Sequence, residues 1–286
     1  MPKGYALTVG LNAVDPQHYQ GWSGPLVACE ADATDMANLL KAQAFTVTTL
    51  LTKQATRAAV RSKLHDAAKQ SKSGDIFVYT NSSHGGHLPD LNGDEDDGQD
   101  ETLCMYDGEI IDDELYQCFS EFAAGVRVLV LSDSCHSGTV TRLSRNGDIL
   151  ALPPTEGPAV RAMPPTVALR TYQANRQLYD ELLRNPALKQ SREAVKAAVL
   201  SISGCMDNQT SSDGTFNGLF TATLLRVWNA GKFTGSYKRF WKQIVSRMPS
   251  DQTPNFFWAN DRDAAFERET PFTIEPARNR SPQHAE

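Results

Sequence analysis

The sequence predicts an α/β fold, a three-layer αβα sandwich in which helices cover both faces of a mainly parallel central sheet. Strand-like and helix-like segments alternate over the first 135 residues, which is the pattern of right-handed βαβ units. Segments 76–80 and 126–131 are apolar almost throughout, as expected for strands buried on both faces. The length of 286 residues has room for one large α/β domain or two small ones, and we expect one.

Each element of the first half is predicted from its own periodicity. Segments 5–11 and 45–51 are short runs of apolar or β-branched residues and are predicted as two further strands. Both come before the strands predicted at 76–80 and 126–131. Two segments with apolar residues at helical spacing are predicted as helices: 28–42 and 55–70. The order strand, helix, strand, helix, strand that results is what a parallel sheet requires, because parallel neighbours need a crossover.

The periodicity is lost between about residues 141 and 170, where prolines stand among small residues. We expect a long exposed connection there. Further along, three segments are predicted as a helix, a buried strand and a last strand, respectively: 172–184, 197–203 and 255–259. Apolar residues recur at helical spacing from Phe216 to Trp228, which predicts another helix. The tail beyond Pro276 is expected to be disordered.

The composition is that of a soluble globular protein, with 40% hydrophobic and 22% charged residues. No apolar run approaches the roughly 18 residues that a membrane span needs, and the first ten residues are too soon polar for a secretory signal. The five cysteines are an odd number without a Cys-x-x-Cys pair, which argues for a reducing compartment. We therefore expect a cytoplasmic protein that does not bind membranes.

The acidic residues are concentrated in one stretch of the chain. Between Ser73 and Val126 there are 14 acidic residues and no Lys or Arg. Such a stretch repels phosphates and attracts cations, so nucleic-acid binding is not expected there. No glycine-rich phosphate-binding motif follows a predicted strand, and no organic cofactor is expected.

The two central strands run into the two most unusual segments of the chain. The first is followed by residues 81–87 (NSSHGGH) and the second by residues 132–138 (SDSCHSG). In an open parallel sheet, sites form beyond the carboxyl ends of the strands. His84 and Cys135 are thus delivered to one edge, where a thiolate nucleophile and its base can meet. His87 and His136 are alternative bases, and a buried, inert cysteine is the alternative to a nucleophile.

These two segments resemble the His-Gly and Asp-x-Cys-x-Gly strand ends of the caspase and metacaspase family of cysteine peptidases. Several further segments resemble the family in the same order along the chain: 28–33 (ACEADA), 89–102, 111–115 and 203–210 (SGCMDNQT). The resemblance implies a caspase-like fold in which Cys135 is the nucleophile and His84 the general base. It also implies an oxyanion hole made by backbone N–H groups that correspond to Gly85 and Cys135.

The resemblance further divides the single domain into parts. Residues 1–140 correspond to the large-subunit half, 141–170 to a proline-rich linker, 171–275 to the small-subunit half and 276–286 to a tail. Asp207, in the segment that resembles the start of the small-subunit half, is a candidate substrate-binding residue.

Acidic residues near the dyad predict the specificity. Asp133 stands two residues before Cys135, so strand geometry places both side chains on one face, and a carboxylate there would select a basic P1 residue. The resemblance adds Asp32, because metacaspases hold Arg or Lys at P1 with equivalent acidic residues. Asp133 could instead cap the next turn, and Asp32 could instead interact with the dipole of its helix.

A protease that cuts after basic residues could also cut its own proline-rich connection. The exposed arginines expected there are candidate self-cleavage sites: Arg142, Arg145, Arg161 and Arg170. The sequence does not single out one of them.

The acidic stretch has a functional and a structural interpretation. By resemblance, calcium-activated metacaspases bind the ion through residues that match Asp100, Asp112 and Asp113. The family's fourth ligand corresponds here to Arg142, a cation. A solvated, self-repelling acidic loop is the alternative. The family also has Gly where this chain has Ser83, which would be strained if that position needed a positive φ.

The expected function is therefore a monomeric cysteine endopeptidase that cleaves peptides or proteins after Arg or Lys. The alternative is a catalytically inactive caspase-like module that binds calcium or protein partners.

Overall fold

A computed structural model describes residues 1–91, 99–134, 160–204, 213, 216–250 and 252–275. Its centre is a six-stranded sheet in the order β2-β1-β3-β7-β8-β9. The strands are β1 (Gly4–Gly10), β2 (Thr46–Leu51), β3 (Ile76–Ser82), β7 (Arg127–Asp133), β8 (Ala198–Ser203) and β9 (Asn255–Trp258). All neighbours are parallel except β8 and β9, which are antiparallel. The predicted mainly parallel α/β sheet is confirmed.

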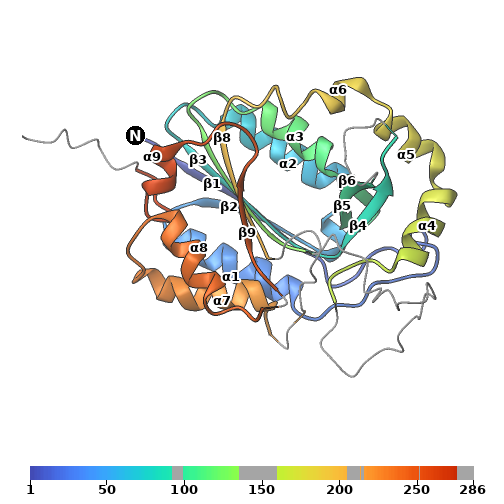
Figure 1. The fold of residues 1–286 in the computed structure, drawn as a ribbon, viewed down its shortest axis with the longest axis horizontal. Helices are drawn as coiled ribbons and strands as arrows, with labels where there is room; N and C mark the ends of the chain where they lie inside the picture. Colours follow the sequence, from blue (N-terminus) through green and yellow to red (C-terminus); the bar gives the residue numbers. More distant parts are fainter. Residues whose placement is uncertain (92–98, 135–159, 205–212, 214–215, 251, 276–286) are drawn as a thin grey trace, which may run out of the picture.

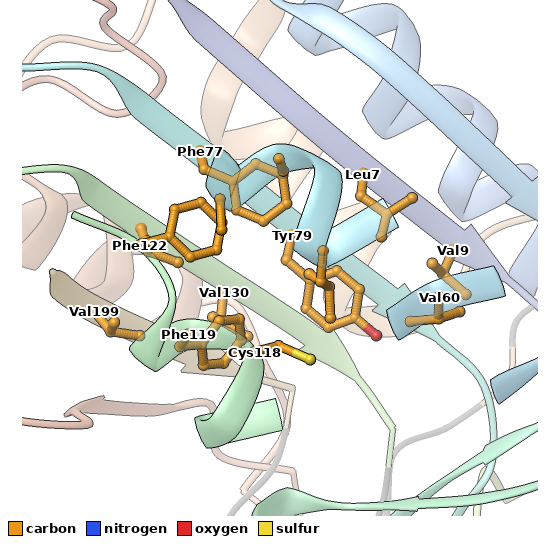
Figure 2. Packing of buried hydrophobic residues seen from close by; sticks show 14 of the residues in the cluster. Leu7, Val9, Val60, Phe77, Tyr79, Cys118, Phe119, Phe122, Val130 and Val199 are labelled. Carbon is orange, nitrogen blue, oxygen red and sulfur yellow. The ribbon is translucent and has the colours of Figure 1, made fainter. Parts of the chain in front are cut away.

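Helices cover both faces of this sheet (Figure 1). One face carries α1 (Cys29–Ala42), α7 (Leu219–Trp228), α8 (Tyr237–Val245) and α9 (Ala264–Arg268), and the other carries α2 (Arg57–Gln70) and α3 (Asp112–Ser120). Each face buries its own hydrophobic cluster. Figure 2 shows the cluster under α2 and α3, where Phe77 and Tyr79 of β3 pack against Phe119 and Phe122. The three-layer arrangement is confirmed.

A second, smaller sheet extends beyond the central one. It consists of β4 (Gly85–Pro89), β5 (Gln99–Met105) and β6 (Gly108–Ile111), which are antiparallel. Three helices accompany it on the same side of the molecule (Figure 1): α4 (Pro165–Ala174), α5 (Arg176–Leu183) and α6 (Pro186–Lys189). Single turns of 3-10 helix stand at η1 (Thr52–Gln54) and η2 (Asn229–Gly231). This sheet is not predicted from the sequence, because its strands lie in the acidic stretch, where hydrophobic alternation is weak.

Three expectations for the second half of the chain were wrong in detail. Residues 161–170 are not an exposed connection: Arg161 is fully buried and α4 begins at Pro165, a favourable first position for a helix. The single helix expected over 172–184 is two helices that meet at Asn175. Phe216 is 83% exposed and precedes α7 rather than belonging to its apolar face. The tail 276–286 lies outside the described residues.

The register of β3 against β7 sets the position of the site. The two strands pair in parallel from Ile76 with Arg127 to Ser82 with Asp133, so both end at the same level. On the side of α1 and α7, Ser82 and Asp133 face the helices that the apolar residues before them pack against. Among the described residues, none of the helices is long and apolar enough to cross a membrane.

Candidate functional site

The carboxyl ends of β3 and β7 are joined by side-chain hydrogen bonds. The amide of Asn81 donates to the hydroxyls of Ser83 and Ser134, at 2.9 Å each. Ser83 and Ser134 are buried. Ser83 has no positive φ, so serine in place of the family's glycine causes no backbone strain here. Cys135 and the other residues of segment 135–159 lie outside the described residues, as does Asp207.

His84 follows directly after this junction and is buried. Its Nε2 lies 3.1 Å from the carbonyl oxygen of Gly24. Because a carbonyl only accepts, Nε2 carries the proton and Nδ1 holds the lone pair. That Nδ1 is buried and makes no hydrogen bond to any described residue. The ring of Trp22 packs on the imidazole at 4.7 Å between centroids, so a loop that the sequence analysis did not consider orients the histidine.

Burial also fixes the charge of this imidazole. Desolvation lowers the pKa of His84 to about 4, with the hydrogen bond to the Gly24 carbonyl acting in the opposite direction. The ring is therefore neutral at pH 7 and is able to accept a proton at Nδ1.

Three carboxylates surround the guanidinium of Arg161, and we call this arrangement the acidic pocket. The Nη2 atom of Arg161 donates to Asp32 at 2.7 Å and to Asp213 at 2.9 Å. Its Nη1 atom lies 3.0 Å from a carboxylate oxygen of Asp133 and donates to the hydroxyl of Ser82 at 2.8 Å. All of these side chains are buried. The structure thus brings Asp32 and Asp133 together around a basic side chain.

The acidic pocket holds more negative than positive charge. Desolvation, and after it the charge of the neighbouring Asp133, raise the pKa of Asp32 to about 6 against the lowering effect of Arg161. Asp32 is held in place by other donors as well, since the backbone N–H of Gly218 donates to it at 2.9 Å. Asp133 accepts from the backbone N–H and the hydroxyl of Thr221. The carboxylates are therefore positioned by α1 and by the start of α7, and not only by the arginine.

Gly218 makes room for the guanidinium. A Cβ atom at this position would lie 2.4 Å from Nη2 of Arg161, far inside van der Waals contact. Because the guanidinium is fixed by its three partners, it has little freedom to move aside. A residue without a side chain is thus required here whenever an arginine fills the acidic pocket.

The main chain of Arg161 is also bound. The N–H of Gly85 donates to its carbonyl oxygen at 2.9 Å, and the N–H of Met163 donates to the carbonyl of Gly85 at 2.7 Å. Gly85 and Ala162 form a parallel bridge. Residues 161–163 therefore lie along the start of β4, to which one isolated parallel bridge joins them.

Asp213 and the buried location of Arg161 are two features of the site that the sequence does not predict. Asp213 follows a motif that resembles the start of the small-subunit half, and its other carboxylate oxygen accepts from the N–H of Val27. No local pattern marks it, because its partners are 52 and 186 residues away in sequence. Arg161 stands among prolines and small residues, which locally predict exposure.

The candidate calcium ligands lie away from the acidic pocket. Asp100 is buried on β5, and Asp112 and Asp113 open α3, where the N–H of Asp113 donates to Asp112 at 2.8 Å. Carboxylate oxygens suit calcium chemically. Within the described ranges, however, no group of three or more His, Cys, Asp or Glu side chains is arranged to hold a metal ion.

The three cysteines among the described residues are not expected to be reactive. Cys29, Cys104 and Cys118 are buried free thiols, and desolvation raises the pKa of each.

A cavity of about 320 Å³ lies on the opposite face of the sheet, between α3 and the ends of β7, β8 and β9, with Asp112, Ser132 and Arg192 among its lining residues. It is separate from the acidic pocket, which the arginine fills.

Comparisons with known proteins agree with this geometry. The sequence model of the family described as "Caspase domain" matches residues 3–265. Metacaspase-1 of Schizosaccharomyces pombe is 31% identical over 255 residues, which cover 77% of this chain and 57% of the relative. Metacaspase-1 of Coccidioides immitis is 31% identical over 249 residues, covering 77% of this chain and 52% of the relative. The chain thus spans little more than half the length of these relatives.

A solved structure is also similar. The crystal structure of a protein from Geobacter sulfurreducens is 54% identical in sequence, with a TM-score of 0.84, and the match covers 96% of this chain and 100% of that one. This similarity confirms the fold expected from the sequence.

Proposed function

Because this chain belongs to the caspase family, we propose that it is a cysteine endopeptidase that cleaves peptide bonds after Arg or Lys. Cys135 is the proposed nucleophile and His84 the proposed general base. The acidic pocket is the proposed binding site for the P1 side chain, the residue on the acyl side of the cleaved bond. Its peptide or protein substrates would therefore present a basic residue.

The observation that carries the proposal is the set of three carboxylates around one guanidinium. A pocket that selects an arginine needs carboxylates within hydrogen-bonding distance of the guanidinium, and N–H or O–H donors that hold those carboxylates in place. Asp32, Asp133 and Asp213 supply the charge, at 2.7 to 3.0 Å from the arginine nitrogens. An acidic P1 side chain would be repelled there.

His84 has the properties that the base in this reaction needs. Its Nδ1 is unprotonated and makes no bond to the rest of the described chain, so it can take the proton of a thiol. Continuing the register that pairs Ser82 with Asp133 by two residues would bring His84 opposite Cys135. We propose that Nδ1 first accepts the proton of the Cys135 thiol and then donates it to the leaving amine.

Gly85 is the proposed oxyanion donor. A backbone N–H that stabilises the tetrahedral intermediate must already point at the carbonyl oxygen of the P1 residue. The N–H of Gly85 binds the carbonyl of a pocket-bound arginine at 2.9 Å, which supports this role.

Fluorogenic peptides with Arg, Lys, Gln or Asp at P1 test the proposal. We expect hydrolysis of the Arg and Lys peptides only, and a loss of at least about 10³-fold in Cys135→Ala and in His84→Ala. His87→Ala is the matched control, because His87 lies on β4 beyond two glycines. Activity close to wild type in either dyad variant would contradict the assignment, and an inactive wild-type chain would favour the non-catalytic module. Calcium activation, a monomeric state and a cytoplasmic location stay predictions.

A further inference from the structure

A buried carboxylic acid, Glu109, lies beneath the segment that follows β3. It belongs to β6, is fully buried, and has no part in the proposed chemistry or in the acidic pocket. Its Oε2 accepts a hydrogen bond from the hydroxyl of Thr102 on β5 at 2.6 Å. Its Oε1 is also buried and makes no hydrogen bond to any described residue. Charging a carboxyl group that keeps one oxygen away from both water and donors is costly.

The side chain of Glu109 lies against Gly86, the residue after the proposed oxyanion donor. A Cβ atom on Gly86 would lie 2.8 Å from Oε2 of Glu109 and 2.9 Å from Oγ1 of Thr102. It would lie 2.6 Å from Cε of Met163. The close approach of these three side chains therefore requires glycine at this position. We call the three side chains the Gly86 support.

The main chain of the same segment is held by β5. Strand β5 pairs with β4 so that Thr102 stands opposite Gly86. The N–H of Cys104 donates to the carbonyl oxygen of His84 at 2.9 Å. Glu109 stands opposite Cys104 in the next pair of strands. Strand β5 thus holds both ends of the segment that begins with His84, and Glu109 binds the residue of β5 that faces Gly86.

The surroundings of Glu109 contain no ion-pair partner for it among the described residues. The hydroxyl of Tyr179 accepts from the backbone N–H of Glu109 at 3.1 Å and lies 2.7 Å from Nε2 of His18. Arg57 is the cation that acts on Glu109, but its Nη2 donates to both carboxylate oxygens of Glu114, at 2.9 and 2.8 Å. The titratable or charged groups around Glu109 come from the loop before α1, from α2, from β5 and from α5: His18, Tyr19, Arg57, Cys104 and Tyr179.

These surroundings make Glu109 a group that titrates near neutral pH. Burial raises the pKa of Glu109 to about 7, against the lowering effects of the Thr102 hydroxyl and of Arg57. Burial also raises the pKa values of Tyr19, Cys104 and Tyr179 and lowers that of His18. Those four groups are therefore uncharged at pH 7, and Glu109 is the member of the cluster whose charge changes there.

We propose that Glu109 is a positioning residue for the oxyanion donor Gly85, that it supports Gly86 as an uncharged acid, and that its ionisation lowers kcat. The inference rests on the proposed peptidase function. A negative charge beneath Gly86 opposes the negative charge that the tetrahedral intermediate places at the neighbouring N–H. A charged Oε1 would also compete for the N–H groups of this segment. The acidic pocket is built from other side chains, so KM for an Arg-P1 peptide should change little.

The first experiment measures kcat and KM for an Arg-P1 peptide between pH 6.5 and 8.5. In the wild type we expect kcat to fall by a few-fold to about tenfold as the pH rises through 7, with KM nearly constant. Glu109→Gln should keep the rate of the wild type at pH 6.5 and lose this decrease, because the amide still accepts from Thr102 and does not ionise. Glu121→Gln is the matched control, an exposed carboxylate at the end of α3, and should behave as the wild type.

Three results of this experiment count against a specific claim. An alkaline decrease that persists in Glu109→Gln would overturn the inference, and so would a wild type whose kcat does not decrease. Both results leave the proposed peptidase function standing. A wild type that hydrolyses no peptide at any pH would instead contradict the proposed function.

The second experiment uses Thr102→Val, which keeps the shape of the side chain and removes the donor to Glu109. The lost hydrogen bond stabilised the carboxylate, so the pKa of Glu109 should rise and the decrease in kcat should move to higher pH. A purely structural role of Thr102 and Glu109 would lower kcat equally at every pH. A midpoint that stays in place or moves to lower pH would therefore overturn the inference.

The third experiment detects the proton on Glu109 without using peptidase activity. Because the pKa of Glu109 in the folded chain lies above the usual 4.5, its contribution to stability is present at low pH and is lost as the pH rises through 7. Urea denaturation should show that the wild type loses stability relative to Glu109→Gln between pH 5.5 and 8. A stability difference that stays constant over this range would show that Glu109 does not titrate there and would overturn the inference.

Discussion

Two charged clusters with buried carboxylates lie on opposite faces of the central sheet, and their ratios of acidic to basic groups are opposite. In the acidic pocket, three carboxylates share the guanidinium of Arg161. Between α2 and α3, the fully buried carboxylate of Glu114 is shared by the guanidinium groups of Arg57 and Arg61, at 2.8 and 3.1 Å. The first cluster has excess acid and the second has excess base.

The clusters also differ in what would remain if one partner left. Glu114 accepts a hydrogen bond from the N–H of Ile111 at 3.3 Å as well as from the arginines. It therefore joins α2 to α3 and satisfies an N–H group at the start of α3. The carboxylates of the acidic pocket keep hydrogen bonds to Gly218 and Thr221 without the arginine. The acidic pocket holds one cation among three acids, whereas Glu114 is the one acid that joins two arginines of α2 to α3. We therefore expect that loss of an acid changes ligand binding in the first cluster and the stability of the fold in the second.

Asp133→Asn tests the acidic pocket and should have the largest effect on activity after the variants of His84 and Cys135. Removing one partner of a buried, hydrogen-bonded charge pair costs about 2–5 kcal/mol, so we expect kcat/KM for an Arg-P1 peptide to fall by about 10²–10³-fold. The fold should survive, because two carboxylates remain for one guanidinium. Steady-state kinetics and circular dichroism measure the two effects. Asp35→Asn is the control, since Asp35 binds Asn217 and not the arginine.

If circular dichroism shows that Asp133→Asn loses its structure while Asp35→Asn keeps it, the main role of Asp133 is to stabilise the fold, as for Glu114. Unchanged kinetics would remove Asp133 from the proposed pocket.

Glu114→Gln tests the structural cluster. The substitution keeps the shape and leaves two guanidinium groups without their buried counter-ion, so we expect the free energy of unfolding to fall by about 3 kcal/mol. Chemical denaturation measures this. Below the transition, kcat/KM for an Arg-P1 peptide should equal that of the wild type, because Glu114 lies on α3, on the other face of the sheet from the acidic pocket. A stable variant with altered kinetics would reverse the two roles.

The sequence predicted the central fold because its evidence is local. Apolar runs such as 76–80 and 126–131 are strands buried on both faces, and their order along the chain fixes a parallel sheet. The boundaries of the six central strands and of α1 and α2 differ from the prediction by one or two residues. Strand β3 extends to Ser82 because its last, polar residues still pair with β7. The small sheet β4–β6 was missed because the acidic composition of that stretch hides its alternation.

The candidate site was predictable from local patterns only where it lies at a strand end, and Asp32 on α1 was predicted by resemblance. His84 and Asp133 were placed by the ends of β3 and β7, and Asp32 by resemblance. Asp213 and Arg161 join the site through hydrogen bonds between residues that are 28 to 129 positions apart in the sequence. No periodicity encodes such contacts. Arg161 is buried because distant carboxylates bind its guanidinium. The prolines and small residues next to it in the sequence do not indicate this burial.

The pH dependence of Arg-P1 hydrolysis separates two groups of the site. The pKa of Asp32 is raised to about 6 and that of His84 is lowered to about 4. As the pH falls through 6, protonation of Asp32 removes charge that attracts the P1 arginine, so we expect kcat/KM to drop by a few-fold to about tenfold. A second decrease near pH 4 belongs to His84.

The same proton has the opposite effect on stability. Because the pKa of Asp32 in the folded chain lies above the usual 3.8, the folded state binds the proton more tightly than the unfolded chain does. Its contribution therefore favours folding more as the pH falls from 6 toward 4. In Asp32→Asn the kinetic inflection near pH 6 should disappear and the one near pH 4 should remain. An unchanged profile would assign the inflection to another group.

The smallest expected effect concerns calcium, at the start of the helix that carries Glu114. Asp112 and Asp113 begin α3, where acidic side chains stabilise a helix through its dipole, and resemblance proposes them with Asp100 as calcium ligands. Since they are not arranged as a metal site among the described residues, we expect weak binding, in the roughly millimolar range of loosely built sites, and a few-fold rise in peptidase rate. Rates measured with calcium, with magnesium and in Asp113→Asn test this. If Asp113→Asn responds to calcium as the wild type does, these acids belong with Glu114 in the structural group.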